Sequence, residues 1–336
     1  MTQPVDQFKR PLRDLRISVT DRCNFRCAYC MPADVFHDTF QFLSHDQVLR
    51  YEEITRLARI AVSLGVVKLR ITGGEPLVRR DIVELVAQLT QISGVEDVAM
   101  TTNGFLLEKV AQPLRDAGLA RVTVSLDSLD NDVFLKMNGG KADVAPVLAG
   151  IRAAERAGLM PIKINAVVQR GVNDHTIVDL ARFCKDNGYI LRFIEFMDVG
   201  TRNGWKLDQV VPAKEIIQRI DAELPLEPLE SNYFGEVAER HRYRDGGGEI
   251  GVIASVTQPF CGTCTRLRLS ADGSIYTCLF ALRGVSLRDP LRAGATDDEL
   301  AALLAGVWKK RTDRYSEIRT EQTTGNKKVE MYYIGG

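Results

Sequence analysis

Three cysteines lie close together near the start of the chain, at Cys23, Cys27 and Cys30, with the spacing C-x3-C-x2-C. They follow an apolar run over residues 15–20 that has the pattern of a β-strand. An odd number of clustered thiols leaves one over in any disulfide scheme. Three thiolates suit three irons of a [4Fe–4S] cluster, whose fourth iron is then open to a small molecule. The alternative is a zinc knuckle or three buried thiols; zinc needs four ligands, and His37 is the nearest candidate for the fourth.

A second group of three cysteines lies toward the other end of the chain, at Cys261, Cys264 and Cys278. The same ligand count predicts a second [4Fe–4S] cluster with an open iron, which would be a substrate site. A zinc or purely structural metal site remains the alternative, with His241 as the nearby candidate for its fourth ligand. The one cysteine outside both groups, Cys184, stands in a helical pattern and is expected to be a small buried residue.

Two arginines follow the second cysteine group in an extended run, Arg266 and Arg268. Residues two apart share one face of a strand, so both guanidiniums are expected to project together with Cys264, and Leu267 and Leu269 to take the other face. Paired arginines beside a metal site indicate a bound anion such as phosphate. The chain has no Gly-x4-Gly-Lys-Ser/Thr loop, so a phosphate chain would have to meet separate cationic side chains.

The composition is that of a globular protein without net charge. The chain has 336 residues, of which 45% are hydrophobic and 26% charged, and its formal net charge is zero. A balanced charge argues against nucleic acid or a membrane surface as the partner. The first residues have no signal-peptide pattern, and no apolar run approaches the length of a membrane span. We therefore expect a cytoplasmic protein, in a compartment where clustered thiols stay reduced and hold metal.

Strand and helix patterns alternate over the first two thirds of the chain, which predicts an α/β fold with a parallel sheet. The number of units indicates a partial (β/α)6 barrel over residues 1–225, followed by an α+β extension over residues 226–336 that carries the second cysteine group. The expected strands are 15–20, 66–72, 95–102, 121–127, 161–168 and 189–196; the expected helices are 44–65, which Ser44 would cap, 80–92, 106–117, segments up to 158, and 175–187.

Small and polar residues gather where the expected strands end, which is the edge that carries the chemistry in βα barrels. Gly73-Gly74-Glu75-Pro76 follows the second strand, and Ser125 and Met197 stand at the ends of later strands. Glycine lets a backbone approach a ligand closely, and Glu75 can accept a hydrogen bond from an ammonium or a ribose hydroxyl. Turn chemistry alone would account for the glycines, although not for the cysteines beside them.

The C-x3-C-x2-C motif with an aromatic residue before its last cysteine resembles the radical S-adenosylmethionine superfamily. In that superfamily the methionine part of S-adenosylmethionine chelates the open iron, and the Gly-Gly-Glu-Pro segment binds its amino group. The resemblance implies that four residues contact S-adenosylmethionine here: Tyr29, Gly74, Ser125 and Met197.

Over essentially its whole length, from Arg16 to the last residue, the chain is similar to the GTP 3′,8-cyclase family, which starts molybdenum cofactor biosynthesis. The motifs that carry this likeness are D-R-C-N-F-R-C-A-Y-C-M-P, R-I-T-G-G-E-P-L, C-x2-C-x-R-L-R-L and a terminal Gly-Gly. One variation is Thr265, where some members have asparagine. The resemblance implies that Gly335 and Gly336 reach into the active site and are needed for cyclisation. It also implies GTP contacts from Arg16, Arg70, Thr101, Lys163, Arg266 and Arg268.

The resemblance also implies the reaction. The first cluster would pass an electron to S-adenosylmethionine, and the 5′-deoxyadenosyl radical would remove the 3′ hydrogen of GTP, whose ribose radical then attacks C8 of the guanine. The second cluster would hold the guanine. An external one-electron reductant and a downstream cyclic pyranopterin monophosphate synthase are the implied partners, and a homodimer is a candidate assembly. Two other hypotheses stay open: a radical enzyme that modifies a peptide and uses the second cluster for electron transfer, and a two-cluster electron carrier.

Overall fold

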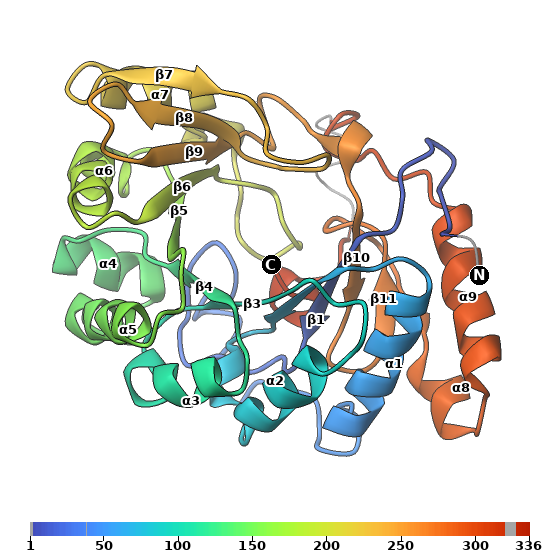
Figure 1. Ribbon diagram of the computed structural model, residues 1–336. Helices are drawn as coiled ribbons and strands as arrows, with labels where there is room; N and C mark the ends of the chain where they lie inside the picture. Colours follow the sequence, from blue (N-terminus) through green and yellow to red (C-terminus); the bar gives the residue numbers. More distant parts are fainter. Residues whose placement is uncertain (1–2, 38, 320–326) are drawn as a thin grey trace.

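The computed structural model describes residues 3–37, 39–319 and 327–336, and its centre is one curved sheet (Figure 1). The sheet has 12 strands in the order β12-β11-β10-β1-β2-β3-β4-β5-β6-β9-β8-β7. Strands β1 to β6 are consecutive in both chain and sheet, and each pair is parallel. This confirms the α/β fold with six parallel βα units. The strands are β1 (Asp14–Ser18), β2 (Lys68–Thr72), β3 (Asp97–Thr102), β4 (Arg121–Ser125), β5 (Lys163–Val168) and β6 (Ile190–Glu195).

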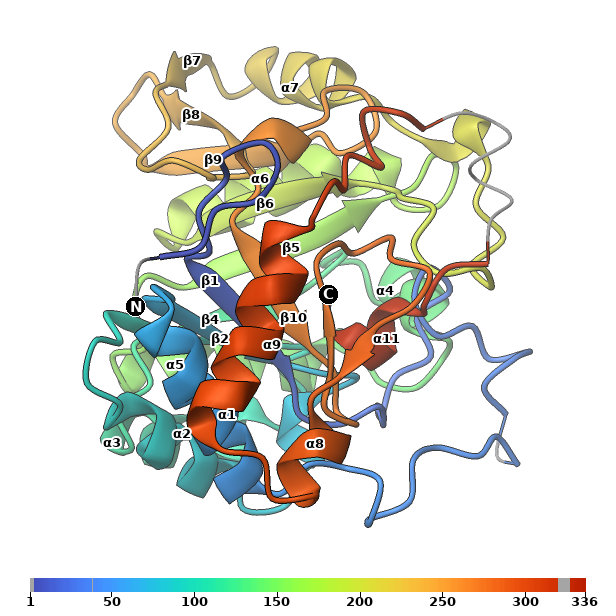
Figure 2. The same cartoon turned by 90° about the vertical axis from the view of Figure 1, so that its right-hand side faces the viewer.

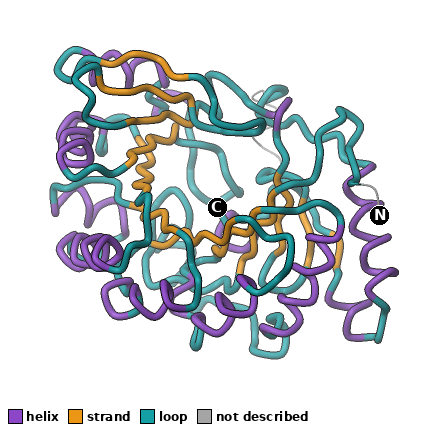
Figure 3. Tube along the Cα trace, in the orientation of Figure 1, coloured by secondary structure: helices purple, strands orange, loops and turns teal. Residues whose placement is uncertain are grey.

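Helices that connect these strands cover the outer face of the sheet (Figure 3). Successive side chains of a strand point to opposite faces, and the helices pack on the apolar face. In β1, Leu15 and Ile17 are buried in the core under the helices. Asp14 and Arg16 have the opposite parity, line a cavity and face the concave side of the sheet, which we call the lumen. The covering helices are α1 (Tyr51–Ser63), α2 (Ile82–Thr90), α3 (Ala111–Asp116), α4 (Asn131–Asn138), α5 (Val144–Arg156) and α6 (Ile177–Asp186).

The chain after residue 225 extends the sheet at both of its edges. Strand β9 pairs in parallel with β6, and β10 pairs in parallel with β1. Strands β10 and β11 form an antiparallel hairpin whose turn contains Asp272 and Gly273, with Gly273 at a φ of 84°. The barrel and the extension are therefore joined through hydrogen-bonded strands. The added strands are β7 (Leu226–Leu229), β8 (Glu239–Tyr243), β9 (Glu249–Ile253), β10 (Arg266–Leu269), β11 (Ser274–Tyr276) and β12 (Val285–Ser286).

The remaining helices lie beside the extension. Helix α9 packs along α1 (Figure 2). It begins with a capping box in which Thr296 and Glu299 bond each other's backbone. Within the described ranges, no helix is long and apolar enough to cross a membrane. The helices are α7 (Ala213–Asp221), α8 (Arg288–Arg292), α9 (Asp297–Lys309) and α11 (Met331–Ile334).

The start of α1 differs from the sequence prediction. Ser44 does not cap this helix; it bonds Gln47 in a separate turn, and α1 begins at Tyr51 behind Arg50. Glu53 accepts from the Arg50 backbone at 2.7 Å and from Arg292 at 2.8 and 3.0 Å. Arg292 lies in α8, so a partner that is distant in the sequence sets the helix start. The other end agrees with the prediction, because Gly65 follows the last turn at a φ of 104°.

Candidate functional site

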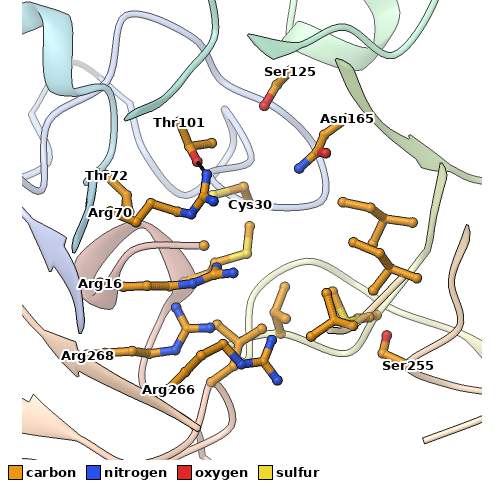
Figure 4. A pocket seen from close by; sticks show the side chains of 18 of the residues that line it. Arg16, Cys30, Arg70, Thr72, Thr101, Ser125, Asn165, Ser255, Arg266 and Arg268 are labelled. Carbon is orange, nitrogen blue, oxygen red and sulfur yellow. Dashed lines mark hydrogen bonds between the residues drawn. The ribbon is translucent and has the colours of Figure 1, made fainter. Parts of the chain in front are cut away.

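The lumen holds one cavity of about 320 Å³ that reaches both cysteine groups. Strand parity brings cationic side chains to it from neighbouring strands: Arg16 on β1 is in register with Arg70 on β2 and Arg268 on β10. Figure 4 shows these guanidinium groups pointing into the cavity, with Ser125 and Asn165 on the other side. A βα barrel normally fills this space with apolar side chains. The cations that line the cavity are Arg16, Lys68, Arg70, Arg121, Arg192, Arg266, Arg268 and Arg311.

Most of these cations have no carboxylate partner among the described residues. Arg70 bonds only hydroxyls, those of Thr101 at 3.4 Å and Thr123 at 3.3 Å. Arg121 and Arg311 are the exceptions, because Arg121 pairs with Asp97 and Arg311 lies 3.5 Å from the carboxylates of Asp6 and Asp313. Burial lowers the pKa of Arg16 and Arg70, and neighbouring guanidiniums lower it further. Arginine nevertheless stays protonated at neutral pH. The lumen therefore carries an excess of positive charge that favours a polyanionic ligand.

The two cysteine groups lie at opposite ends of the same pair of strands. Cys23, Cys27 and Cys30, the first cysteine site, follow the C-terminal end of β1. Cys261 and Cys264 precede the N-terminal end of β10, which runs parallel to β1. The charged lumen lies between the two ends. The second cysteine site consists of Cys261, Cys264 and Cys278, and all six cysteines line the cavity.

Backbone contacts hold the loop of the first cysteine site. The Gly74 amide donates to the Thr20 carbonyl at 2.7 Å, and the next amide donates to Arg22 at 2.9 Å. A Cβ on Gly74 would overlap the Arg22 carbonyl, so this position requires glycine. Inside the loop, Arg26 donates to the carbonyls of Cys23 and Phe25, each at 2.8 Å. The thiols are thus held on a fixed backbone.

The thiol of Cys264 lies in different electrostatic surroundings from those of Cys23 and Cys278. Burial raises the pKa of Cys23 and of Cys278 to about 12. Burial also acts on Cys264, but Arg266 and Arg311 outweigh it and lower its pKa to about 6. Nitrogens of these arginines lie 3.2 and 3.1 Å from the Cys264 sulfur. The second site is therefore already suited to hold a thiolate.

Arg10 and Arg311 anchor the second cysteine site to the N-terminal segment. Arg10 pairs with buried Asp6 at 2.5 Å and donates to the Cys261 carbonyl at 2.7 Å. Arg311 donates to the Cys264 carbonyl at 2.7 Å. Residues near both ends of the chain thus fix the backbone of this site.

The donor sets fit clusters better than zinc. His37, one candidate for a fourth zinc ligand, bonds Thr39 at 2.8 Å. The other, His241, lies on β8 and does not line the cavity. In the described part of the chain, no three His, Cys, Asp or Glu side chains converge as one metal ion requires. Cluster thiolates bind different irons and need not converge on one point. Three thiols at each site, with no fourth ligand among the described residues, fit an iron–sulfur cluster with an open iron.

The residues expected to contact S-adenosylmethionine lie around the first cysteine site. Tyr29, Gly74, Ser125 and Met197 all line the cavity. The Tyr29 hydroxyl donates to Asp127 at 3.0 Å, and burial raises the pKa of this carboxyl to about 6. Asn165 was not predicted from the sequence. Its buried side-chain oxygen, Oδ1, has no hydrogen-bond partner among the described residues. Polar atoms therefore remain available here for a ligand.

Glu75 lines the cavity, and its carboxylate also supports the fold. Its carboxylate accepts from the Thr102 hydroxyl and the Asn103 amide, both at 2.7 Å, and from the Leu77 amide at 3.0 Å. Both oxygens are thus used by protein donors. Burial raises the pKa of Glu75 to about 7, and the three donors oppose that shift. The carboxyl joins the ends of β2 and β3 beneath the cysteine loop.

The last ten residues, 327–336, which we call the tail, return to the lumen. Ile334 is fully buried, and the Tyr332 ring packs on Phe36 with centroids 4.8 Å apart. Gly335 has a φ of 75°, and its carbonyl accepts a hydrogen bond from Arg268. Gly336 lines the cavity. Figure 1 shows this C-terminus inside the curve of the sheet.

The structure brings nearly all the predicted substrate residues together. Arg16, Arg70, Thr101, Arg266 and Arg268 line the cavity. The remaining one, Lys163, begins β5 next to the lumen without lining the cavity. The cations that the prediction missed are Lys68, Arg121, Arg192 and Arg311; the first three share the inward parity of their strands, so the alternation of residues would have identified them.

Comparison with known proteins agrees with this arrangement. The Radical SAM superfamily model matches residues 17–184, and the Molybdenum Cofactor Synthesis C model matches residues 189–317. The structure of Streptococcus suis SuiB bound to S-adenosylmethionine has a TM-score of 0.63 at 16% identity, over 95% of this chain and 73% of that chain. This likeness concerns the fold. Together, the fold and the first cysteine site define a radical S-adenosylmethionine protein.

Relatives specify the family within that class. A protein from Acidothermus cellulolyticus named GTP 3′,8-cyclase is 53% identical over 100% of both chains. Proteins with the same name from Xanthomonas axonopodis and Staphylococcus haemolyticus are 52% and 49% identical, again over 100% of both chains. The chain belongs to the GTP 3′,8-cyclase family.

Proposed function

We propose that this protein uses S-adenosylmethionine to cyclise GTP to (8S)-3′,8-cyclo-7,8-dihydroguanosine 5′-triphosphate, the first step of molybdenum cofactor biosynthesis. One observation carries the proposal: a lumen lined mostly by cations without a carboxylate partner among the described residues lies between two three-cysteine sites. Family membership supports the same activity. A peptide substrate would leave the excess of positive charge unexplained, and an electron carrier would have no use for the cavity.

The first cysteine site would hold the [4Fe–4S] cluster that cleaves S-adenosylmethionine. When bound, that cluster supplies the electron for cleavage, and the 5′-deoxyadenosyl radical takes the 3′ hydrogen of GTP. The protein orients the cofactor through Tyr29, Gly74, Ser125 and Met197, which surround the site. The radical step requires that these residues position the substrate in a near-attack geometry.

The second cysteine site would hold the other [4Fe–4S] cluster, whose open iron is suited to the guanine. Arg266 and Arg311 stabilise thiolate at Cys264 and so favour cluster binding at neutral pH. Arg16, Arg70 and Arg268 would bind the triphosphate, and Thr101 and Lys163 would complete its surroundings. Charge-assisted hydrogen bonds of this kind contribute about 1.5–3 kcal/mol each.

The terminal diglycine would act beside the reacting ribose. Gly335 is already bonded to Arg268, one of the proposed GTP contacts. Glycines keep this backbone thin enough to share the cavity with two ligands. We assign Gly335 and Gly336 to the cyclisation step and not to S-adenosylmethionine cleavage.

Other features of the proposal concern the whole molecule. We place the boundary between the S-adenosylmethionine barrel and the GTP-binding extension near residue 225. The reaction needs an external one-electron reductant, and its product would pass to a cyclic pyranopterin monophosphate synthase.

A cytoplasmic location suits clustered reduced thiols. Nucleic acid and membranes are not expected partners, because the net charge is zero. A homodimer is a candidate assembly.

Anaerobic incubation of the reconstituted protein with GTP, S-adenosylmethionine and dithionite tests this function. The expected products are the cyclised nucleotide, 5′-deoxyadenosine and methionine. ATP in place of GTP is the matched control for substrate choice. Cleavage of S-adenosylmethionine that yields no modified nucleotide, in the presence of intact clusters and GTP, would refute the proposal.

A further inference from the structure

A buried carboxylate three residues beyond the end of β6 binds the start of the tail. Asp198 is 3% exposed. It accepts from the Lys328 ammonium at 2.6 Å, from Arg319 at 2.9 Å and from the Tyr315 hydroxyl at 2.5 Å. Lys328 also donates to the Asp198 carbonyl at 2.8 Å. We call Asp198, Arg319 and Lys328 the clamp. Neither the cysteine motifs nor the proposed GTP contacts include any of them.

The clamp joins segments that are far apart in the sequence. Arg319 donates through a second nitrogen to the Ser255 carbonyl at 2.9 Å, just beyond the end of β9. Asp198 therefore connects the exits of two neighbouring strands, β6 and β9, to Lys328 at the start of the tail. Burial alone would raise the pKa of Asp198, but the bonds from Lys328 and Tyr315 outweigh burial and lower it. The carboxylate is thus held in its charged form.

A second contact lies three residues after Asp198 and two residues after Lys328. Glu330 accepts from the Thr201 amide at 3.0 Å and from the Thr201 hydroxyl at 2.9 Å. Gly200 stands at a φ of 65°, and a Cβ there would overlap the Glu330 carboxylate. Residues 198–201 and 328–330 thus lie against each other at two points, directly before α11.

The same loop also reaches the first cysteine site. Asn203 donates to the Met197 carbonyl at 2.9 Å and to the Tyr29 carbonyl at 3.4 Å. Met197 immediately precedes Asp198, and both Met197 and Tyr29 are proposed S-adenosylmethionine contacts. A fixed path therefore leads from the S-adenosylmethionine side of the cavity to the tail and on to Gly335 at Arg268.

We propose that Asp198 is a positioning residue that seats the tail through Lys328 and so ties GTP cyclisation to S-adenosylmethionine cleavage. This inference rests on the proposed function. Among the described residues, Asp198 bonds Lys328, Arg319 and Tyr315 and none of the cluster cysteines, so it acts through the tail. Without the clamp, the diglycine would lose its place beside Arg268. Cleavage of S-adenosylmethionine would then continue while fewer cleavages end in cyclised GTP.

Two variants test the clamp. Asp198→Asn removes the charge and keeps the shape of the side chain. Lys328→Gln releases the tail but leaves Asp198 paired with Arg319, so it avoids a buried unpaired cation if the first variant folds poorly. The matched control is Glu53→Gln, a buried carboxyl that pairs with Arg292 in α8 and not with the tail.

The readouts are the ratio of cyclised GTP to 5′-deoxyadenosine and the amide hydrogen exchange of residues 329–336. In both clamp variants we expect unchanged iron content, a ratio at least tenfold lower and faster exchange of the tail. Glu53→Gln should keep the wild-type ratio and tail exchange, even if its melting temperature falls. A wild-type ratio and wild-type exchange in both clamp variants would overturn the inference, as would an equal loss of the ratio in Glu53→Gln. If the wild-type protein forms no cyclised GTP, the proposed function fails, and tail exchange alone then decides on the clamp.

Discussion

Replacing Arg16 by methionine should change stability and GTP affinity in opposite directions. Arg16 faces the lumen between Arg70 and Arg268 on the flanking strands, without an acidic partner among the described residues. Neighbouring strands are about 4.8 Å apart, so we take about 7 Å between the charged ends of these side chains. At that distance each repulsion is about 0.6 kcal/mol in water and about 2.4 kcal/mol at an effective dielectric constant of 20.

The cavity admits solvent, so the lower part of that range applies. Methionine keeps most of the arginine stem, and we expect the ligand-free protein to gain about 1–2 kcal/mol from relief of two repulsions. For a chain of this size that gain raises the melting temperature by about 1.5–3 °C. The same variant loses a charge-assisted bond to the triphosphate, about 1.5–3 kcal/mol, so the Kd for GTP should rise about 10- to 150-fold.

Differential scanning calorimetry and isothermal titration on anaerobically reconstituted protein measure the two effects. Arg292→Met is the control, because Arg292 pairs with Glu53 at 2.8 Å on the outside of the barrel. It should lower stability by about 2 kcal/mol and leave GTP affinity unchanged. If Arg16→Met destabilises the protein and leaves the Kd for GTP at its wild-type value, the cation is structural and the reasoning is wrong.

Three further predictions follow from the same site. The protein should bind about 8 irons after reconstitution, and serine at all three positions of either cysteine site should halve that number. Only the first site should be essential for S-adenosylmethionine cleavage. Stoichiometric zinc at the second site would contradict the two-cluster assignment. Burial, and then the charges of Arg192, Arg121 and Arg70, lower the pKa of Lys163 to about 8. Its charge is therefore full below pH 8 and lost above it, so GTP affinity should fall by up to tenfold per pH unit above pH 8, and Lys163→Arg should flatten that profile in titrations. Deletion of Gly335 and Gly336 should preserve iron content and binding of both ligands but abolish cyclisation, as chromatography of the products would reveal; full activity of the truncated protein would leave the tail without a role.

Local patterns predicted the parts of the fold that depend on neighbours in sequence. The parallel βα order follows from the alternation of strand and helix runs. The face shared by Arg266 and Arg268 follows from strand parity, and the opposite residues, Leu267 and Leu269, are buried in the core as expected. The same reasoning, applied to every strand, would have found Arg192 as well.

Long-range contacts account for what the sequence did not reveal. Ser44 has the residue type of a helix cap, yet Arg292 in α8 stabilises a start at Arg50 through Glu53. The two edges of the sheet receive strands from one C-terminal segment, and no local signal shows which strand goes to which edge. The clamp at Asp198 likewise depends on Lys328, 130 residues away.

Glu75 illustrates a related difficulty. Its place in a Gly-Gly-Glu-Pro segment indicates a ligand contact, whereas in the structure its three donors come from Leu77, Thr102 and Asn103. A carboxylate beside a ligand site and one that supports that site have the same residue type at the same spacing. Only the hydrogen-bond partners distinguish these roles.

The central claim, that a radical generated at the first cysteine site reacts with GTP held in the lumen, is tested most directly by isotope transfer. The reconstituted protein is incubated anaerobically with dithionite, S-adenosylmethionine and GTP that carries deuterium at C3′, and 5′-deoxyadenosine is analysed by mass spectrometry. The account predicts one deuterium in the 5′-deoxyadenosine and none at C3′ of the cyclised nucleotide. Cyclised product accompanied by unlabelled 5′-deoxyadenosine would contradict it.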